Sequence, residues 1–61
     1  MTKVEILIEL KKGKKVTHKD FLKHEYLEMI DGKIYTEDGF DFTNQFNIIK
    51  RFDDGWSLYI A

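Results

Sequence analysis

The chain has 61 residues, of which 43% are hydrophobic and 34% charged, and its formal net charge is −1. A chain of this length forms at most one domain, and it buries only about 60% of the surface that its unfolded form exposes. The absence of cysteine excludes disulfide bonds and thiolate zinc sites, and the apolar content argues against disorder. We therefore expect a single small domain, residues 1–61, that is stabilised by its hydrophobic core alone or together with a partner.

The first segment, residues 4–10, alternates Val4, Ile6, Ile8 and Leu10 with other side chains, a period of two that predicts a strand. The lysine-rich run 11–15 has Gly13 at its centre and predicts a turn into a short extended piece around Val16. A first hairpin is therefore expected at the start of the chain.

Next, Thr17-His18-Lys19-Asp20 matches a helix-capping box with Asp in place of Glu, and it predicts a short helix near 18–24. Whether this helix continues through residues 25–30 is open. Glu25 and Glu28 would oppose the helix dipole there, which favours a strand.

The remainder of the chain reads as a meander. Three Asp-Gly pairs, at 31–32, 38–39 and 54–55, have the residues that tight hairpin turns prefer. They separate short runs rich in β-branched and aromatic residues, which predict strands over 25–30, 33–36, 40–42, 46–52 and 56–60. The predicted fold is mainly β, with α+β as a possibility: an antiparallel β-meander or partly open barrel with one short helix near 18–24.

Charge is distributed unevenly along this sequence. Residues 1–24 hold seven lysines against three carboxylates, whereas residues 25–61 hold three basic residues against eight carboxylates. Charge complementarity within the domain explains such a division, and so does a charged partner. Arg51 is the single arginine among ten basic residues, a usage typical of A+T-rich genes of bacteria and their phages.

Residues that carry enzyme chemistry do not form a recognisable pattern. His18 and His24 are six apart, which fits no common zinc motif, and Ser57 lies inside a predicted strand. Glu37, Asp38 and Asp41 do not have the spacing of a calcium loop. A chain this short also has little room for a pocket that would tune a catalytic carboxylate. We expect no enzyme activity, no catalytic residue, no metal and no other cofactor.

The carboxyl-terminal half carries the leading binding hypothesis. Carboxylates surround strands that bear aromatic side chains, a combination with which acidic hairpins can occupy a basic groove of another protein. The expected function is a non-enzymatic protein-binding module, a small regulator or inhibitor of bacterial or phage type. The candidate binding residues are Tyr35, Glu37, Asp38, Phe40 and Asp41.

Two alternatives remain open. A small barrel that binds nucleic acid would use a basic face formed by Lys11, Lys12, Lys14, Lys15, Lys19 and Lys23. A homodimeric structural subunit would complete its small core with a second copy. The predicted strand 4–10, with an exposed Leu7, could also pair with another copy or with the sheet of a target. No apolar run approaches the roughly 20 residues of a membrane span, and no secretory pattern is present, so a cytoplasmic protein without a membrane partner is expected.

Overall fold

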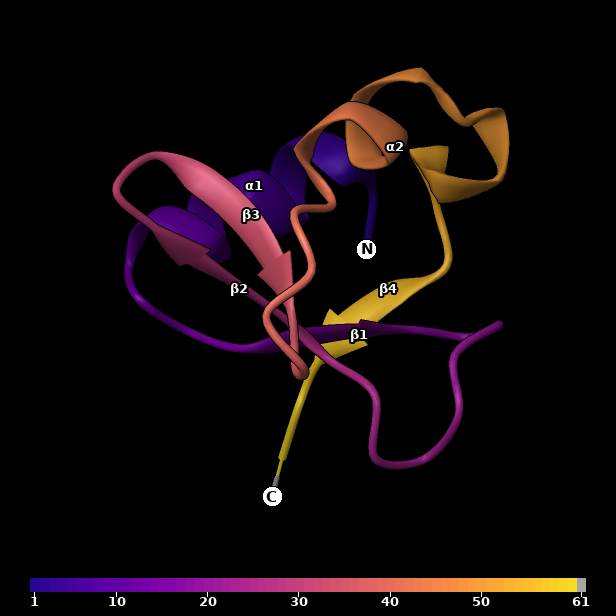
Figure 1. Cartoon of the computed structure of the whole chain (residues 1–61). Coiled ribbons are helices and arrows are strands. Elements are labelled where there is room, and N and C mark those ends of the chain that lie inside the picture. The colour runs from indigo at the N-terminus through magenta and orange to yellow at the C-terminus, as the bar shows by residue number, and fades with distance from the viewer. Residues whose placement is uncertain (61) are drawn as a thin grey trace.

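Four short strands form one open antiparallel sheet in the order β3-β2-β1-β4, as Figure 1 shows. The computed structural model describes residues 1–60. A small antiparallel fold is thereby confirmed, and the sheet does not close into a barrel. In chain order, the elements are α1 (Lys3–Lys11), β1 (Val16–His18), β2 (Leu27–Ile30), β3 (Lys33–Thr36), α2 (Thr43–Ile48), the 3₁₀ helix η1 (Lys50–Asp53) and β4 (Trp56–Leu58).

Helix α1 occupies the segment for which a strand was predicted, so the prediction for residues 4–10 is wrong. Thr2 and Glu5 form a complete capping box: the Glu5 N–H donates to Thr2 Oγ1, and the Thr2 N–H donates to Glu5 Oε1 at 2.8 Å. At the other end, Gly13 has a φ of 88°, and its N–H donates to the Leu10 carbonyl while the Lys14 N–H donates to that of Glu9. These bonds are those of a Schellman motif, so both ends of the helix are encoded locally.

The capping box gives α1 a pH-dependent contribution to stability. Hydrogen bonds from the Thr2 backbone N–H and hydroxyl lower the pKa of Glu5 from its ordinary value of 4.5. A lowered pKa in the folded state stabilises the fold above the unfolded value, and this contribution is lost as the pH falls through the folded value. We expect Glu5→Gln to lower the free energy of unfolding at about pH 7 and to have a shrinking effect toward about pH 3. Urea denaturation of both proteins across that range measures this difference, and a constant difference would exclude a contribution from the carboxylate.

The predicted helix near 18–24 is also wrong. Thr17 and His18 belong to β1, where they pair with Ser57 and Trp56 of β4. The Thr17 hydroxyl donates to the Glu25 carbonyl at 2.9 Å instead of capping a helix. The polar residues of this segment therefore stabilise a strand and the irregular loop 19–26.

The β2–β3 hairpin confirms both the strands and the turn predicted for this region. Asp31 and Gly32 have φ values of 52° and 79°, as a two-residue turn with the twist of the flanking strands requires. The register pairs Leu27 with Thr36 and Ile30 with Lys33. The question of whether 25–30 is helix or strand is therefore resolved in favour of a strand over Leu27–Ile30.

Two further strand predictions are wrong. In 40–42 only Asp41 pairs, through an isolated bridge to Tyr35, and 46–52 folds as the end of α2 followed by η1. Phe46 is fully buried, whereas Ile48, which a strand would place on the same face, is 69% exposed. The turn at 54–55 accordingly joins η1 to β4 and is not part of a hairpin, although the predicted strand after it is present as β4.

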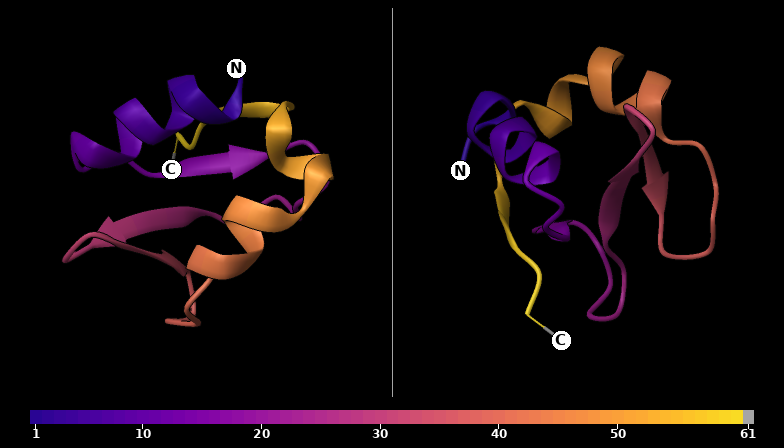
Figure 2. Two further views of the ribbon diagram at one scale, coloured as in Figure 1. Left: turned by 90° about the horizontal axis from the view of Figure 1, so that it is seen from above. Right: turned by 90° about the vertical axis from the view of Figure 1, so that its left-hand side faces the viewer.

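The core lies between the sheet and the helices. Helix α1 contacts β1, β2 and β4, and α2 contacts β3, an arrangement visible in Figure 2. The buried hydrophobic residues come from every element: Ile6, Leu10, Val16, Leu27, Ile34, Phe46, Phe52 and Trp56. No helix within residues 1–60 has the length and apolar character needed to cross a membrane.

A buried histidine connects the core to the loops. The His18 ring lies edge-on to Phe52 and Trp56, with centroids 5.0 and 4.9 Å away. Its Nε2 lies 3.0 Å from the Arg51 carbonyl oxygen and 2.7 Å from that of Asp54, so Nε2 carries a proton. Nδ1 accepts the Asp20 N–H at 3.1 Å. Both ring nitrogens are thus hydrogen-bonded, and the ring holds the loop 19–26 and the η1–β4 turn together.

Candidate functional site

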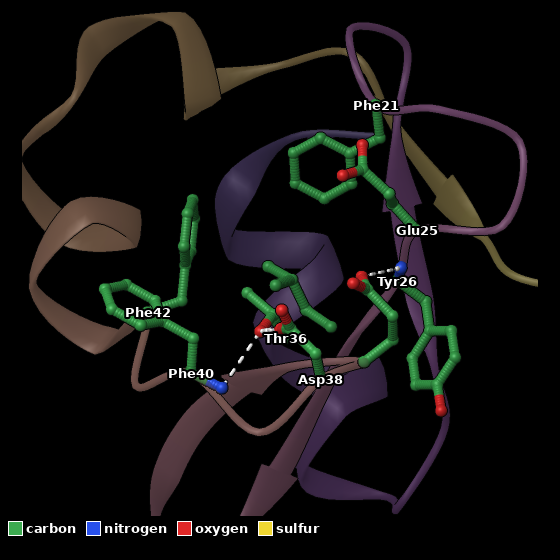
Figure 3. Close-up of a pocket in the computed structure, with 9 residues that line it drawn as sticks. Phe21, Glu25, Tyr26, Thr36, Asp38, Phe40 and Phe42 are labelled. Atoms are coloured by element: carbon green, nitrogen blue, oxygen red, sulfur yellow. Dashed lines mark hydrogen bonds between the residues drawn. The ribbon is translucent and has the colours of Figure 1, made fainter.

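A cavity of about 240 Å³ lies where the β2–β3 hairpin meets the loop 19–26 and the start of α2. We call it the hairpin pocket. Its walls combine aromatic rings with three carboxylates, and Figure 3 shows Phe21 and Glu25 on one side and Phe40 and Phe42 on the other. The lining residues are Phe21, Glu25, Tyr26, Leu27, Thr36, Glu37, Asp38, Phe40 and Phe42.

The hairpin turn explains how the acidic residues meet. Because Leu27 pairs with Thr36, continuation of the same register places Tyr26 opposite Glu37 and Glu25 opposite Asp38. The strands stop pairing here, and the Tyr26 N–H donates to Glu37 Oε1 at 3.3 Å. The side chain of Glu37 thereby replaces the next rung of the backbone ladder.

Each of the other two carboxylates accepts a hydrogen bond through one of its two oxygens. Glu25 Oε1 accepts the Leu22 N–H at 2.6 Å, and Asp38 Oδ1 accepts the hydroxyl of Thr36. The same Thr36 hydroxyl oxygen accepts the Phe40 N–H at 3.0 Å. Each carboxylate therefore has a fixed position, while its second oxygen has no hydrogen-bond partner among the described residues.

The aromatic walls are supported by the core. Phe21 packs edge-on against Phe42, Phe52 and Trp56, with ring centroids 5.8 to 6.3 Å away. Phe42 in turn contacts Phe52 at 5.4 Å. Phe40, by contrast, is 57% exposed at the rim. The pocket thus has two anchored rings and one ring that is free to contact a ligand.

Within the part of the chain that the structure describes, the carboxylates of the hairpin pocket lack the ion pairs that Glu9 and Asp53 make elsewhere on the surface. Among residues 1–60, no basic side chain lies within 4.0 Å of the carboxylates of Glu25, Glu37 or Asp38. Elsewhere, Glu9 is paired with Lys12 and Lys14, and these contacts, chiefly the hydrogen bond from Lys14, lower its pKa. The pocket therefore brings together three carboxylates that make no direct ion pair with the described residues.

The structure places three of the five candidate binding residues, Glu37, Asp38 and Phe40, in the hairpin pocket. Tyr35 precedes Thr36 in β3, and strand alternation directs its side chain to the opposite face of the sheet. Asp41 accepts the Thr43 N–H at 3.0 Å, a bond that lowers its pKa and helps to start α2. Asp41 lines a neighbouring surface hollow that also has Phe40 in its wall.

Sequence reasoning did not identify the other lining residues as a site. The sequence does contain a signal for Glu25 and Tyr26. The register set by the Asp31-Gly32 turn places Tyr26 opposite Glu37 and Glu25 opposite Asp38. For Phe21 and Phe42 the sequence has no comparable signal. Both reach the pocket from outside the hairpin, through packing against Phe52.

The six lysines of the nucleic-acid hypothesis form two groups. Lys11, Lys12, Lys14 and Lys15 lie at the end of α1 and in the following loop, whereas Lys19 and Lys23 lie in the loop beyond β1. Four residues of extended chain place the backbones of Lys15 and Lys19 about 13 Å apart. Lys12 and Lys14 contact Glu9, and Lys15 Nζ lies 4.7 Å from the centroid of the Tyr26 ring. Half of these ammonium groups are therefore already engaged within the chain.

The edges of the sheet are also engaged. The β3 edge is covered by the segment that follows it, since Thr36 N–H donates to the Phe40 carbonyl and Phe42 N–H to that of Ile34. On the β4 edge, the Trp56 N–H donates to the Met1 carbonyl at 3.2 Å. Residues 4–10 form a helix in which Leu7 packs against the core, so strand pairing through this segment is excluded as a route to a homodimer.

Other chemistry finds little support in the described residues. No group of three or more His, Cys, Asp and Glu side chains in residues 1–60 is arranged to hold a metal ion. Comparisons with protein-family models, with curated proteins and with solved structures gave no significant match. The inference of function therefore rests on the geometry of the hairpin pocket.

Proposed function

We propose that this chain is a non-enzymatic protein-binding module that occupies the surface of a target protein through the hairpin pocket, as a small regulator or inhibitor does. The observation that carries the proposal is the set of three unpaired carboxylates among aromatic rings. Aromatic side chains supply most of the affinity in many protein interfaces, and charged groups steer the encounter.

Burial supports this proposal. Glu25 and Glu37 are half-buried, and removing a carboxylate from water without an opposite charge is unfavourable. A positively charged partner surface would reduce that cost on binding. The pocket thus fits a ligand of complementary charge better than it fits a purely structural role.

The distribution of charge favours a protein over a nucleic acid as the partner. The hollow surface is acidic and would repel phosphates, whereas the lysines are split between two loops and partly paired. A nucleic-acid surface typically gathers its basic residues along one face. The acidic pole is therefore the binding surface that we propose.

A pair of matched double variants tests this proposal. Glu37→Gln/Asp38→Asn removes two charges from the pocket and keeps the acceptor oxygens that bond Tyr26 and Thr36. Glu28→Gln/Asp31→Asn removes two charges from the same hairpin, on the opposite face of β2 and at the turn.

Lysate of the source cells is divided into nuclease-treated and untreated halves. Each immobilised protein is incubated with both halves, and the retained proteins are quantified by mass spectrometry. We expect at least one protein to be retained by the native chain and by the control, and about tenfold less by the pocket variant. Equal retention by all three proteins would refute the hairpin pocket as the binding surface. Retention that disappears with nuclease treatment would favour the lysine-based alternative.

A further inference from the structure

We infer that the hairpin pocket receives a single arginine side chain from an extended basic segment of the partner. This inference rests on the proposed function and specifies the chemistry of its ligand. Three properties of the pocket carry it: its size, its combination of charge and aromatic surface, and the arrangement of its free oxygens.

The volume of the hairpin pocket limits its ligand to about one amino-acid side chain. Pockets for drug-sized ligands have volumes of about 300–1,000 Å³, and the hairpin pocket, with about 240 Å³, falls below that range. Because it is formed at the rim of a hairpin, with Asp38 and Phe40 exposed, a side chain from another protein can enter without any movement of the core. A long, unbranched side chain with a charged end fits a volume of this size.

The walls match a cation. Phe21, Phe40 and Phe42 provide ring surfaces, and the faces of aromatic rings attract ammonium and guanidinium groups. The chain itself makes this kind of contact next to the pocket, where Lys15 lies over the Tyr26 ring. The pocket carboxylates then supply the counter-charge.

The free oxygens favour arginine over lysine. Glu25, Glu37 and Asp38 each use one oxygen to accept a bond from the chain and leave the other available. A planar guanidinium has five N–H donors and can contact two carboxylates while its face stacks on a ring. An ammonium is a compact, strongly hydrated charge that does not stack, so we expect it to bind less tightly.

Amide NMR with short peptides tests this inference on the intact chain. The probes are acetyl-Gly-X-Gly-amide, in which X is arginine, lysine or citrulline; citrulline has nearly the shape of arginine but no charge. We expect the arginine peptide to bind with a dissociation constant in the millimolar range, and the citrulline peptide about tenfold more weakly. The largest chemical-shift changes should occur at the amides of Tyr26 and Phe40, which donate to Glu37 and Thr36.

The matched variants complete the test. Glu37→Gln/Asp38→Asn should weaken arginine binding about tenfold, and Glu28→Gln/Asp31→Asn should change it less than about twofold. The inference is overturned if citrulline or lysine binds as tightly as arginine, if the shifts lie away from the pocket, or if the pocket variant binds like the native chain. In any of these cases a pocket-dependent partner in the lysate experiment would leave the proposed function standing, with a different ligand.

Discussion

Phe46→Ala should remove a large part of the free energy of unfolding of this chain. Phe46 is fully buried in α2 and contacts Trp56 with ring centroids 5.3 Å apart, while Lys3 Nζ lies 5.6 Å from its ring centroid. Truncation of a buried phenylalanine costs about 3–5 kcal/mol. At about 0.05–0.15 kcal/mol per residue, the whole stability of a 61-residue chain is only about 3–9 kcal/mol.

Ile48→Ala is the matched control for this prediction. Ile48 lies two residues further along α2 and is 69% exposed, so its truncation should change the free energy of unfolding by no more than about 0.5 kcal/mol. Urea denaturation followed by circular dichroism measures both variants. Similar losses in the two variants would mean that the residues share a buried face, as in the strand predicted from the sequence, and would contradict the helix.

The second large effect is expected for His18→Ala. This change removes a fully buried ring and leaves the carbonyls of Arg51 and Asp54 without their donor. Loss of these part-buried hydrogen bonds, together with the cavity left by the buried ring, should cost about 2–4 kcal/mol. His24→Ala, at an exposed position in the following loop, should be nearly neutral.

His18→Gln separates the hydrogen bonds from the packing. The glutamine amide nitrogen can donate to the same carbonyls that His18 Nε2 contacts, so we expect His18→Gln to be more stable than His18→Ala. Thermal denaturation of the three proteins at one pH gives the comparison. If His18→Gln and His18→Ala unfold at the same temperature, the hydrogen bonds contribute nothing measurable and packing alone explains the role of His18.

The features that could be predicted from the sequence are those set by local chemistry. A two-residue hairpin turn needs positive φ at both of its central positions, and Asp31 and Gly32 both adopt it. This turn then sets the register in which the flanking strands pair. That register also places two of the pocket carboxylates, Glu25 and Asp38, across from each other. The acidic half of the site was therefore predictable in outline.

The errors arise where a period-two pattern and a helix fit the same residues. In 4–10, Val4, Ile6, Ile8 and Leu10 alternate with other residues, yet Ile6 and Leu10 are buried while Val4 and Ile8 are exposed. Because Val4 and Ile8 are apolar although they lie on the exposed side of α1, the helical period is hidden. The local signals that determine the structure are the capping box of Thr2 with Glu5 and the Schellman motif at Gly13.

The aromatic half of the site depends on tertiary structure. Phe21 and Phe42 are separated by 21 positions in the sequence, and their rings meet at 6.3 Å because both pack against Phe52. The conformation of the loop that carries Phe21 is held in part by His18, whose carbonyl accepts the Phe21 N–H at 2.9 Å. No local pattern encodes such contacts, and this is why the pocket was not recognised from the sequence.

We propose that the hairpin pocket binds another protein. The most direct test is calorimetric titration of one purified protein, retained by the native chain in the lysate experiment, with the native chain and with the two double variants. We expect Glu37→Gln/Asp38→Asn to weaken binding by about tenfold or more, which corresponds to about 1.4 kcal/mol, and Glu28→Gln/Asp31→Asn to leave the affinity within about twofold of the native value. Equal affinities for the two double variants would show that the pocket carboxylates do not contact the partner, and would contradict the claim.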